Sequence, residues 1–246
     1  MNTATPTELP SLDSREFAMV SSTASVVDAA SPTRFRYHQR GALVWGEYAG
    51  DTARIGRFIG RRDGNTVTMR FGHVNAETGL ITRGGATTEI SQDADGTLRL
   101  GEDFDKDGEQ HRSECVEVTD AFDWPVPSGA QPFTPSVNGV RFALESSSAS
   151  TVNHDSPSIF DYNESDGLLW GEYRGDTVTF GYFVGQRDGD RLNEDFVHHH
   201  IATDRALLGD SSTRVATRED GRLELIEDFV LDGVPGVSVC VQIDKD

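Results

Sequence analysis

Hydrophobic and polar residues alternate along most of the chain. In Leu98–Phe104 the two leucines, Glu102 and the phenylalanine fall on one face of an extended strand, and the residues between them fall on the other. Turn residues such as Asp63-Gly64 separate these runs, because Asp-Gly supplies the positive φ angles that tight hairpins require. No window keeps the 3.6-residue period of a capped helix. The pattern therefore predicts antiparallel strands joined in hairpin order.

The sequence contains an internal repeat of this pattern. Residues 17–118 align without a gap with residues 142–243, at a constant offset of 125, and 42 of the 102 aligned pairs are identical. The pentapeptide that contains Trp45-Gly46-Glu47-Tyr48 recurs around Trp170-Gly171-Glu172-Tyr173. Four of the nine prolines lie between the copies. The predicted units are a flexible N-terminus (1–15), a first repeat (16–118), a stiff proline-rich linker (119–140) and a second repeat (141–246).

Each copy has room for about eight strands. An antiparallel meander of this size leaves exposed edges unless it closes on itself. Eight strands close into a barrel that is filled by side chains or holds one small ligand. The predicted fold is therefore all-β, with two tandem antiparallel eight-stranded up-and-down β-barrels of calycin or avidin type. Two packed open sheets are the alternative.

Several short motifs resemble a family of small bacterial all-β proteins labelled N-acetylglutamate synthase-like. They include Phe35-x-Tyr37, Trp45–Tyr48, Phe71-x-His73-x-Asn75 and Asp95–Phe104, and they cover most of each copy. The resemblance implies a single all-β domain of this size, and its label implies acetyl transfer. Acetyl-CoA enzymes present a glycine-rich loop at a helix N-terminus. The chain has no such strand–loop–helix, so no acetyl transfer and no cofactor are predicted.

The charge and composition of the chain limit the classes of binding partner that are expected. The chain has 22 Lys+Arg against 41 Asp+Glu, a formal net charge of −19. Nucleic acids and anionic membranes both need a basic face, so neither is predicted as a partner. The sequence has no secretory signal and no apolar run of membrane-spanning length, and its two cysteines are too few for a disulfide framework. A cytoplasmic location is expected.

Two acids and two histidines are predicted inside the barrels. Alternation places Glu102 on the same face as Leu98 and Leu100, and the second copy repeats this with Glu227. It also places His73 and His198 inside. A carboxyl and an imidazole in an apolar interior have shifted pKa values and can act as acid and base, or can anchor a polar ligand group. The alternative is a buried hydrogen bond with a structural role.

Aromatic residues near these positions are candidates for a pocket wall or for a solid core. The Trp-Gly-Glu-Tyr strand has two half-apolar faces, so alternation does not decide which face points inward. The predicted ligand-binding residues are Trp45, Glu47, Tyr48 and Phe71 in the first copy, and Trp170, Glu172, Tyr173, Phe196 and His200 in the second.

The run His198-His199-His200 occurs in the second copy alone. His198 and His200 project to one face of a strand, a spacing found in β-barrel metalloenzymes, and Glu227 is a conceivable third ligand. His-x-His is a weak motif by itself, so no metal is predicted.

Three functions remain open. The first is binding of a small apolar or amphipathic molecule in at least one barrel. The second is an isomerase or cyclase that uses the interior Glu and His as an acid–base pair on an apolar metabolite. The third is a non-catalytic protein-interaction module. The histidine run makes the second copy the more promising of the two.

Overall fold

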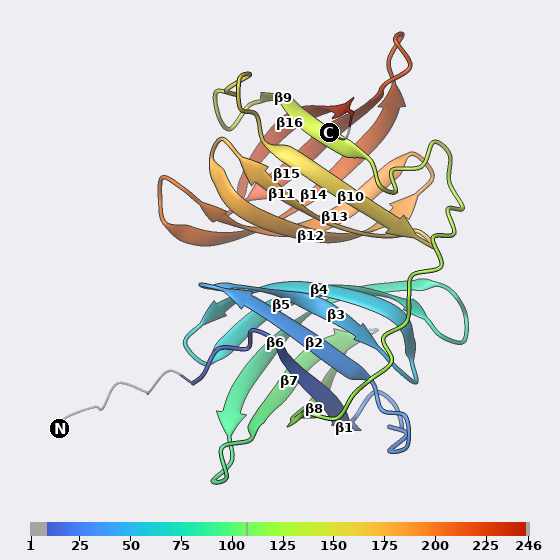
Figure 1. Ribbon diagram of the computed structural model, residues 1–246, viewed down its shortest axis with the longest axis vertical. Helices are drawn as coiled ribbons and strands as arrows, with labels where there is room; N and C mark the ends of the chain where they lie inside the picture. Colours follow the sequence, from blue (N-terminus) through green and yellow to red (C-terminus); the bar gives the residue numbers. More distant parts are fainter. Residues whose placement is uncertain (1–8, 107, 245–246) are drawn as a thin grey trace, which may run out of the picture.

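The computed structural model describes residues 9–106 and 108–244, and this part of the chain forms two closed antiparallel barrels of eight strands each (Figure 1). The predicted fold class is confirmed. The first barrel consists of β1 (Arg15–Ser22), β2 (Arg34–Arg40), β3 (Leu43–Ala49), β4 (Ala53–Asp63), β5 (Thr66–Asn75), β6 (Ile81–Gln92), β7 (Leu98–Lys106) and β8 (Glu109–Val118). The second consists of β9 (Arg141–Ser147), β10 (Ile159–Ser165), β11 (Leu168–Gly175), β12 (Val178–Asp188), β13 (Arg191–His200), β14 (Arg205–Thr217), β15 (Leu223–Leu231) and β16 (Val234–Ile243).

Each strand pairs with its neighbours in the sequence, and the last strand of each copy pairs with the first. Val116 lies opposite Ala18 where β8 meets β1, and Val241 lies opposite Ala143 where β16 meets β9. This closure leaves no free sheet edge, which explains why a meander of eight strands is stable without a covering layer. Turn glycines such as Gly64 (φ 58°) adopt the left-handed conformation that the Asp-Gly pattern predicts.

The two barrels bury the same aromatic cluster. Tyr37 contacts Phe17 and Phe58, with ring centroids 5.2 and 4.6 Å away. The second copy repeats the arrangement around Tyr162, at 5.4 and 4.5 Å from the equivalent rings. The inward positions are those that the period-two pattern assigns to one face of each strand.

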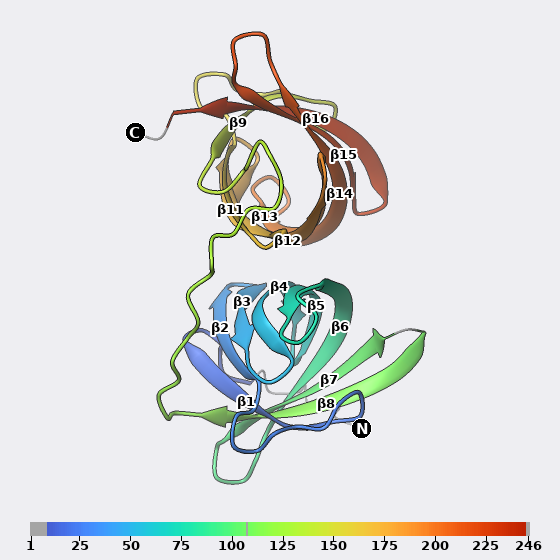
Figure 2. The same cartoon turned by 90° about the vertical axis from the view of Figure 1, so that its right-hand side faces the viewer.

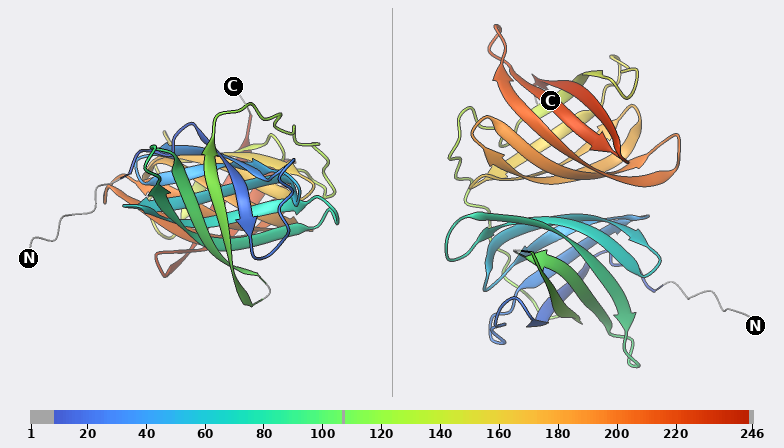
Figure 3. Two further views of the ribbon diagram at one scale, coloured as in Figure 1. Left: turned by 90° about the horizontal axis from the view of Figure 1, so that it is seen from below. Right: turned by 180° about the vertical axis from the view of Figure 1, so that it is seen from behind.

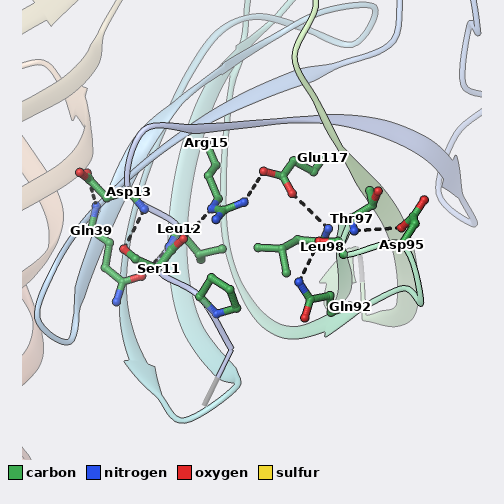
Figure 4. A network of polar contacts seen from close by, with 12 residues as sticks. Ser11, Leu12, Asp13, Arg15, Gln39, Gln92, Asp95, Thr97, Leu98 and Glu117 are labelled. Atoms are coloured by element: carbon green, nitrogen blue, oxygen red, sulfur yellow. Dashed lines mark hydrogen bonds and ion pairs between the residues drawn. The ribbon is translucent and has the colours of Figure 1, made fainter. Parts of the chain in front are cut away.

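The segment before each barrel crosses one of its ends and closes it. Leu12 and Val137, which are equivalent in the two copies, are both fully buried. In the first barrel the backbone N–H of Leu12 donates to the side-chain Oε1 of Gln39 (2.9 Å). The backbone N–H of Gln39 in turn donates to Oδ1 of Asp13 (3.0 Å), as Figure 4 shows. Residues 1–8 of the predicted flexible N-terminus lie outside the described residues, whereas Leu12 belongs to the core.

Below each of these segments lies a buried arginine. Arg62 donates to the carbonyls of Leu9 and Pro10 and to Gln39. Arg187 donates to the Pro135 carbonyl and forms an ion pair with Glu164 at 3.0 Å, in which both side chains are fully buried. The last part of the predicted linker, with Pro135 and Val137, packs against this end of the second barrel.

The barrels pack side by side through β4 and β5 of the first and β12 and β13 of the second (Figure 2 and Figure 3). Outward-facing side chains from both barrels form one apolar cluster there: Leu43, Ile55, Ile59, Val74, Leu168, Val184, Val197 and Ala206. At its border the rings of Trp45 and Tyr182 stack with centroids 4.1 Å apart. No helix in the described residues is long and apolar enough to cross a membrane.

Candidate functional site

The second barrel contains a cavity of about 230 Å³. It begins at the end opposite the buried Arg187, where Ser150, Thr177 and His200 surround the opening, and extends inward to Tyr162. The other lining residues are Leu144, Ser147, Ala149, Ser158, Phe160, Tyr173, Val178, Phe183, Glu194, Phe196, His198, Ser211, Glu227, Phe229, Leu231 and Ser238. Pockets for drug-sized ligands span roughly 300–1,000 Å³, so this cavity suits a smaller molecule.

Aromatic rings line one side of the cavity, and glycines make their packing possible. The ring of Phe160 stacks on Tyr173, with centroids 4.9 Å apart. Gly181 lies behind Tyr173, where a Cβ atom would fall 2.4 Å from the ring. A larger residue there would push Tyr173 into the lumen. The glycine therefore sets the position of the tyrosine hydroxyl.

That hydroxyl contacts His198. The Tyr173 oxygen lies 2.8 Å from Nδ1 of His198, and the imidazole stacks against Phe196 at 6.0 Å. His198 is 5% exposed, and its Nε2 is buried with no hydrogen-bond partner among the described residues. Burial, and then the neighbouring His200, lower the pKa of His198 to about 4. The imidazole is therefore uncharged near neutral pH and turns one free polar atom to the cavity.

Glu194 is the second buried polar group, and it is not among the predicted site residues. It is 3% exposed. Its Oε2 accepts hydrogen bonds from Tyr162 (3.3 Å) and Thr213 (3.5 Å), while its Oε1 is buried without a partner among the described residues. Burial, and then the nearby Glu227, raise the pKa of Glu194 to about 8.

The sequence does carry a signal for Glu194. Its counterpart in the first copy is Met69, which alternation places on the same face as Phe71 and His73. An acid in place of an inward methionine is a strong departure between the copies. A search for residues shared by both copies passes over it, because the signal is a difference.

Glu227 lies inside the barrel as predicted from its spacing. The Ser238 hydroxyl donates to its Oε2 at 2.5 Å. Burial raises the pKa of Glu227, and the hydrogen bond from Ser238 opposes that rise. Phe196, Tyr173 and His200 from the predicted set line the same cavity.

The first barrel places the equivalent residues in its interior. Tyr48 contacts Nδ1 of His73 at 2.8 Å, and Ser113 donates to Glu102 at 3.1 Å. Burial raises the pKa of Glu102. Phe71 stacks on His73, with centroids 6.5 Å apart. The Tyr–His contact and the Ser–Glu contact are therefore common to both copies.

Four predicted ligand-binding residues lie elsewhere. Trp45, Glu47, Trp170 and Glu172 point away from their own lumens and line a groove of about 320 Å³ between the barrels. Glu47 pairs with Arg36 and Arg57, and the Arg57 guanidinium lies 4.8 Å from the centre of the Trp170 ring. The structure does not bring these four residues to the cavity. The inward residues of this strand are Tyr48 and Tyr173.

The histidine run divides between two surfaces. His198 and His200 face the cavity, with ring centroids 6.3 Å apart, whereas His199 points outward and contacts Asp204 (2.9 Å). Within residues 9–106 and 108–244, no three His, Cys, Asp or Glu side chains are grouped so that they could hold a metal ion.

A closed eight-stranded barrel with a partly polar cavity at one end is the architecture of barrels that hold a single small ligand. Comparison with protein families assigns the chain within this class. The model of the avidin-like protein family matches residues 10–118 and 135–243, once over each barrel. The chain therefore belongs to the avidin-like family. This finding supports the predicted avidin-type barrel and gives no support to the resemblance to N-acetylglutamate synthase-like proteins.

Other comparisons add little. A search of curated proteins finds no match. Among solved structures, the chain is similar to a Bacteroides fragilis protein described provisionally as an outer membrane protein, at 8% identity over 93% of this chain and 96% of that one. The TM-score of 0.28 is too low for this similarity to bear on fold or function.

Proposed function

We propose that this protein binds a small apolar or amphipathic molecule in the cavity of its second barrel. One observation carries the proposal: three buried polar atoms of residues that line the cavity, Oε1 of Glu194, Nε2 of His198 and Oγ of Ser211, have no partners among the described residues. A buried polar group without a hydrogen bond costs roughly 1–3 kcal/mol, so such groups persist where a bound molecule satisfies them. Membership of the avidin-like family supports the same function.

The shape of the site agrees with such a ligand. Phe160, Phe183 and Phe196 offer apolar contact, while the carboxyls and the imidazole offer a few convergent polar contacts. Small-molecule sites generally combine an apolar wall with a small number of polar groups that fix orientation. The ligand is expected to present one polar end to Glu194 and His198 and an apolar body to the rings.

Native mass spectrometry of the full chain tests this function. The protein is examined as purified and after mixing with small aromatic alcohols, acids and amines. We expect an adduct of one small molecule per chain. Ser211→Leu, which projects into the cavity, abolishes the adduct. Ser212→Leu is the matched control, because this neighbour on β14 faces away from the lumen, and it retains the adduct. Equal binding by both variants, or no adduct at all, would contradict the proposal.

Acid–base catalysis in the same cavity is the second candidate. Glu194 has a pKa near working pH, and Glu227 and His198 line the same lumen, a combination suited to proton transfer on a bound metabolite. NMR of a molecule found in the first experiment, incubated with the protein in D₂O, detects this chemistry as deuterium entering C–H positions. Replacement of Glu227 by Gln would stop the exchange. A bound molecule that stays unlabelled leaves binding as the function.

A further inference from the structure

The lumen of the second barrel is unusual in its charge. Two carboxyl groups, those of Glu194 and Glu227, face it, and no lysine or arginine is present among the described residues that line it. The first barrel has Met69 where the second has Glu194. The added acid therefore changes the chemistry of one barrel inside an otherwise repeated scaffold.

The two carboxyls lie on either side of β14. Glu194 of β13 pairs in register with Ser211, and Glu227 of β15 pairs in register with Thr213. Thr213 also donates to Oε2 of Glu194. The pKa of Glu194 is raised first by burial and second by the nearby carboxyl of Glu227, so the two glutamates are close together. A group seated at this point of the lumen is exposed to both acids.

Side-chain hydroxyls of the protein donate to both acids. Tyr162 and Thr213 both donate to Oε2 of Glu194, and Ser238 donates to Oε2 of Glu227. Oε1 of Glu194 receives no donor from the described residues and is buried. A carboxylate oxygen in this state is stabilised most by a charged N–H donor, since charge-assisted hydrogen bonds are about twice as strong as neutral ones.

We propose that the ligand of this cavity is a small organic cation, whose protonated amine or amidine group donates to Oε1 of Glu194 beside Glu227 and whose apolar body lies against the aromatic wall. This inference rests on the proposed binding function and specifies its ligand class. The ring of Phe196 adds cation–π attraction to a positive group in the lumen. An anionic ligand would meet two acids and no basic partner in this lining.

The pH dependence follows from the groups that face the site. Those that line the cavity are Tyr162 of β10, Tyr173 of β11, His198 and His200 of β13 and Glu227 of β15. Two groups outside the lining also act on Glu194 or respond to it: Arg83 of β6 favours its charged form, and Cys240 of β16 is buried nearby. Burial raises the pKa values of both tyrosines and of Cys240, so these groups keep their protons. His198, with a pKa of about 4, stays uncharged above pH 5.

The pH dependence of cation binding therefore comes mostly from Glu194 and Glu227. At pH 7 Glu194 holds its proton, because its pKa is about 8. A cation bound beside it favours the ionised form, so binding releases a proton to the buffer and strengthens as the pH rises toward 8. The limiting slope is a tenfold change in affinity per pH unit for each proton released.

Isothermal titration calorimetry of the full chain with benzylamine, benzyl alcohol and benzoate tests the ligand class. These probes share a ring and differ in charge. We expect benzylamine to bind one per chain, at least tenfold more tightly than benzyl alcohol, with benzoate weakest. Titrations in buffers of different ionisation enthalpy should show proton release at pH 7. Glu194→Gln and Glu194→Met should each weaken benzylamine binding at least tenfold.

Asp228→Asn is the matched control, because it removes an exposed carboxyl next to Glu227 on the outer face of β15. It should change the affinity less than twofold, and circular dichroism verifies that each variant is folded. If benzyl alcohol or benzoate binds as tightly as benzylamine, the proposal of a cationic ligand is wrong, whereas the proposed binding function stands. If none of the three binds, the cation is again overturned, and the comparison of Ser211→Leu with Ser212→Leu decides the binding function separately.

Discussion

The two barrels have the same fold and differ in what their interiors can do. Both contain the Tyr–His contact, at 2.8 Å in each, and both place a glutamate against a serine. Where Met69 fills the first interior, with its sulfur 3.0 Å from the Thr88 hydroxyl, the second has Glu194 with an unpartnered oxygen. A single inward substitution therefore adds a second acid to the lumen while the surrounding scaffold stays the same.

The closed ends differ in a parallel way. Arg62 contacts the neutral amide of Gln39, whereas Arg187 contacts the carboxylate of Glu164. The second barrel thus buries an ion pair at its closed end and the ionisable carboxyls of Glu194 and Glu227 in its lumen. Buried charges cost stability unless they are paired, so the second barrel is expected to respond more strongly to substitution and to pH.

The largest expected effect is at this closed end. Arg187→Met leaves the Glu164 carboxyl buried without its charged partner and should destabilise the second barrel by about 3–5 kcal/mol. Arg62→Met removes hydrogen bonds to the Leu9 and Pro10 carbonyls and to the Gln39 amide, and should cost less, because hydrogen bonds contribute less than a buried ion pair. Hydrogen exchange measured by mass spectrometry, with peptides assigned to each barrel, reports the two free energies of unfolding separately. Equal losses of stability in the two barrels would contradict this difference between their closed ends.

The next effect is at Glu194. Glu194→Met reproduces the first barrel and should stabilise the second by about 1–3 kcal/mol at pH 8, since it removes a desolvated carboxyl with an unmet hydrogen bond. The converse change, Met69→Glu, should destabilise the first barrel by a similar amount. Hydrogen exchange of peptides from each barrel, measured at increasing denaturant concentration, gives the free energy of unfolding of each barrel in both variants. Loss of stability in Glu194→Met would show that the acid has a structural partner.

This substitution also has a signature in pH. The folded-state pKa of Glu194, about 8, lies above the value near 4.5 of an unperturbed glutamate. The protonated form is thus favoured by folding, and the stability of the second barrel should fall as the pH rises from about 4.5 through 8. His198 acts in the opposite sense, because its pKa is lowered to about 4, and it removes stability as the pH falls below about 6.5. Glu194→Met should lessen the fall in stability between about pH 4.5 and 8 and keep the contribution of His198, measured by chemical denaturation across this range.

The smallest effect concerns the shared Tyr–His contact. Tyr173→Phe removes the partner of His198 in a fully buried setting and should cost about 0.5–1.5 kcal/mol. Tyr48→Phe should cost less, because His73 is partly exposed and water can replace the hydroxyl. The two variants are compared by thermal unfolding and by NMR titration of the imidazoles. A larger loss of stability for Tyr48→Phe than for Tyr173→Phe would contradict the prediction that the more deeply buried contact contributes more.

Much of the site could be predicted from the sequence because strand periodicity is strict. Alternation from Leu98 is enough to place Glu102 inside, and the repeat carries the same conclusion to Glu227. The face of Trp45 and Trp170 could not be predicted in this way. The outer face of their strands is apolar because it packs against the other barrel, as Leu168 does, so both faces look like a core.

The all-β class, the duplication and about eight strands in each copy follow from the amino-acid sequence, since period two, Asp-Gly turns and a 125-residue offset are local and repeated signals. The structure settles that these strands close into barrels rather than two open sheets. Which residues contact one another depends on the folded structure. Glu194, Glu227 and His198 come from separate parts of the chain, and their pKa shifts arise from shared burial within one lumen. Burial and proximity depend on how the whole barrel closes, and no single strand carries that information.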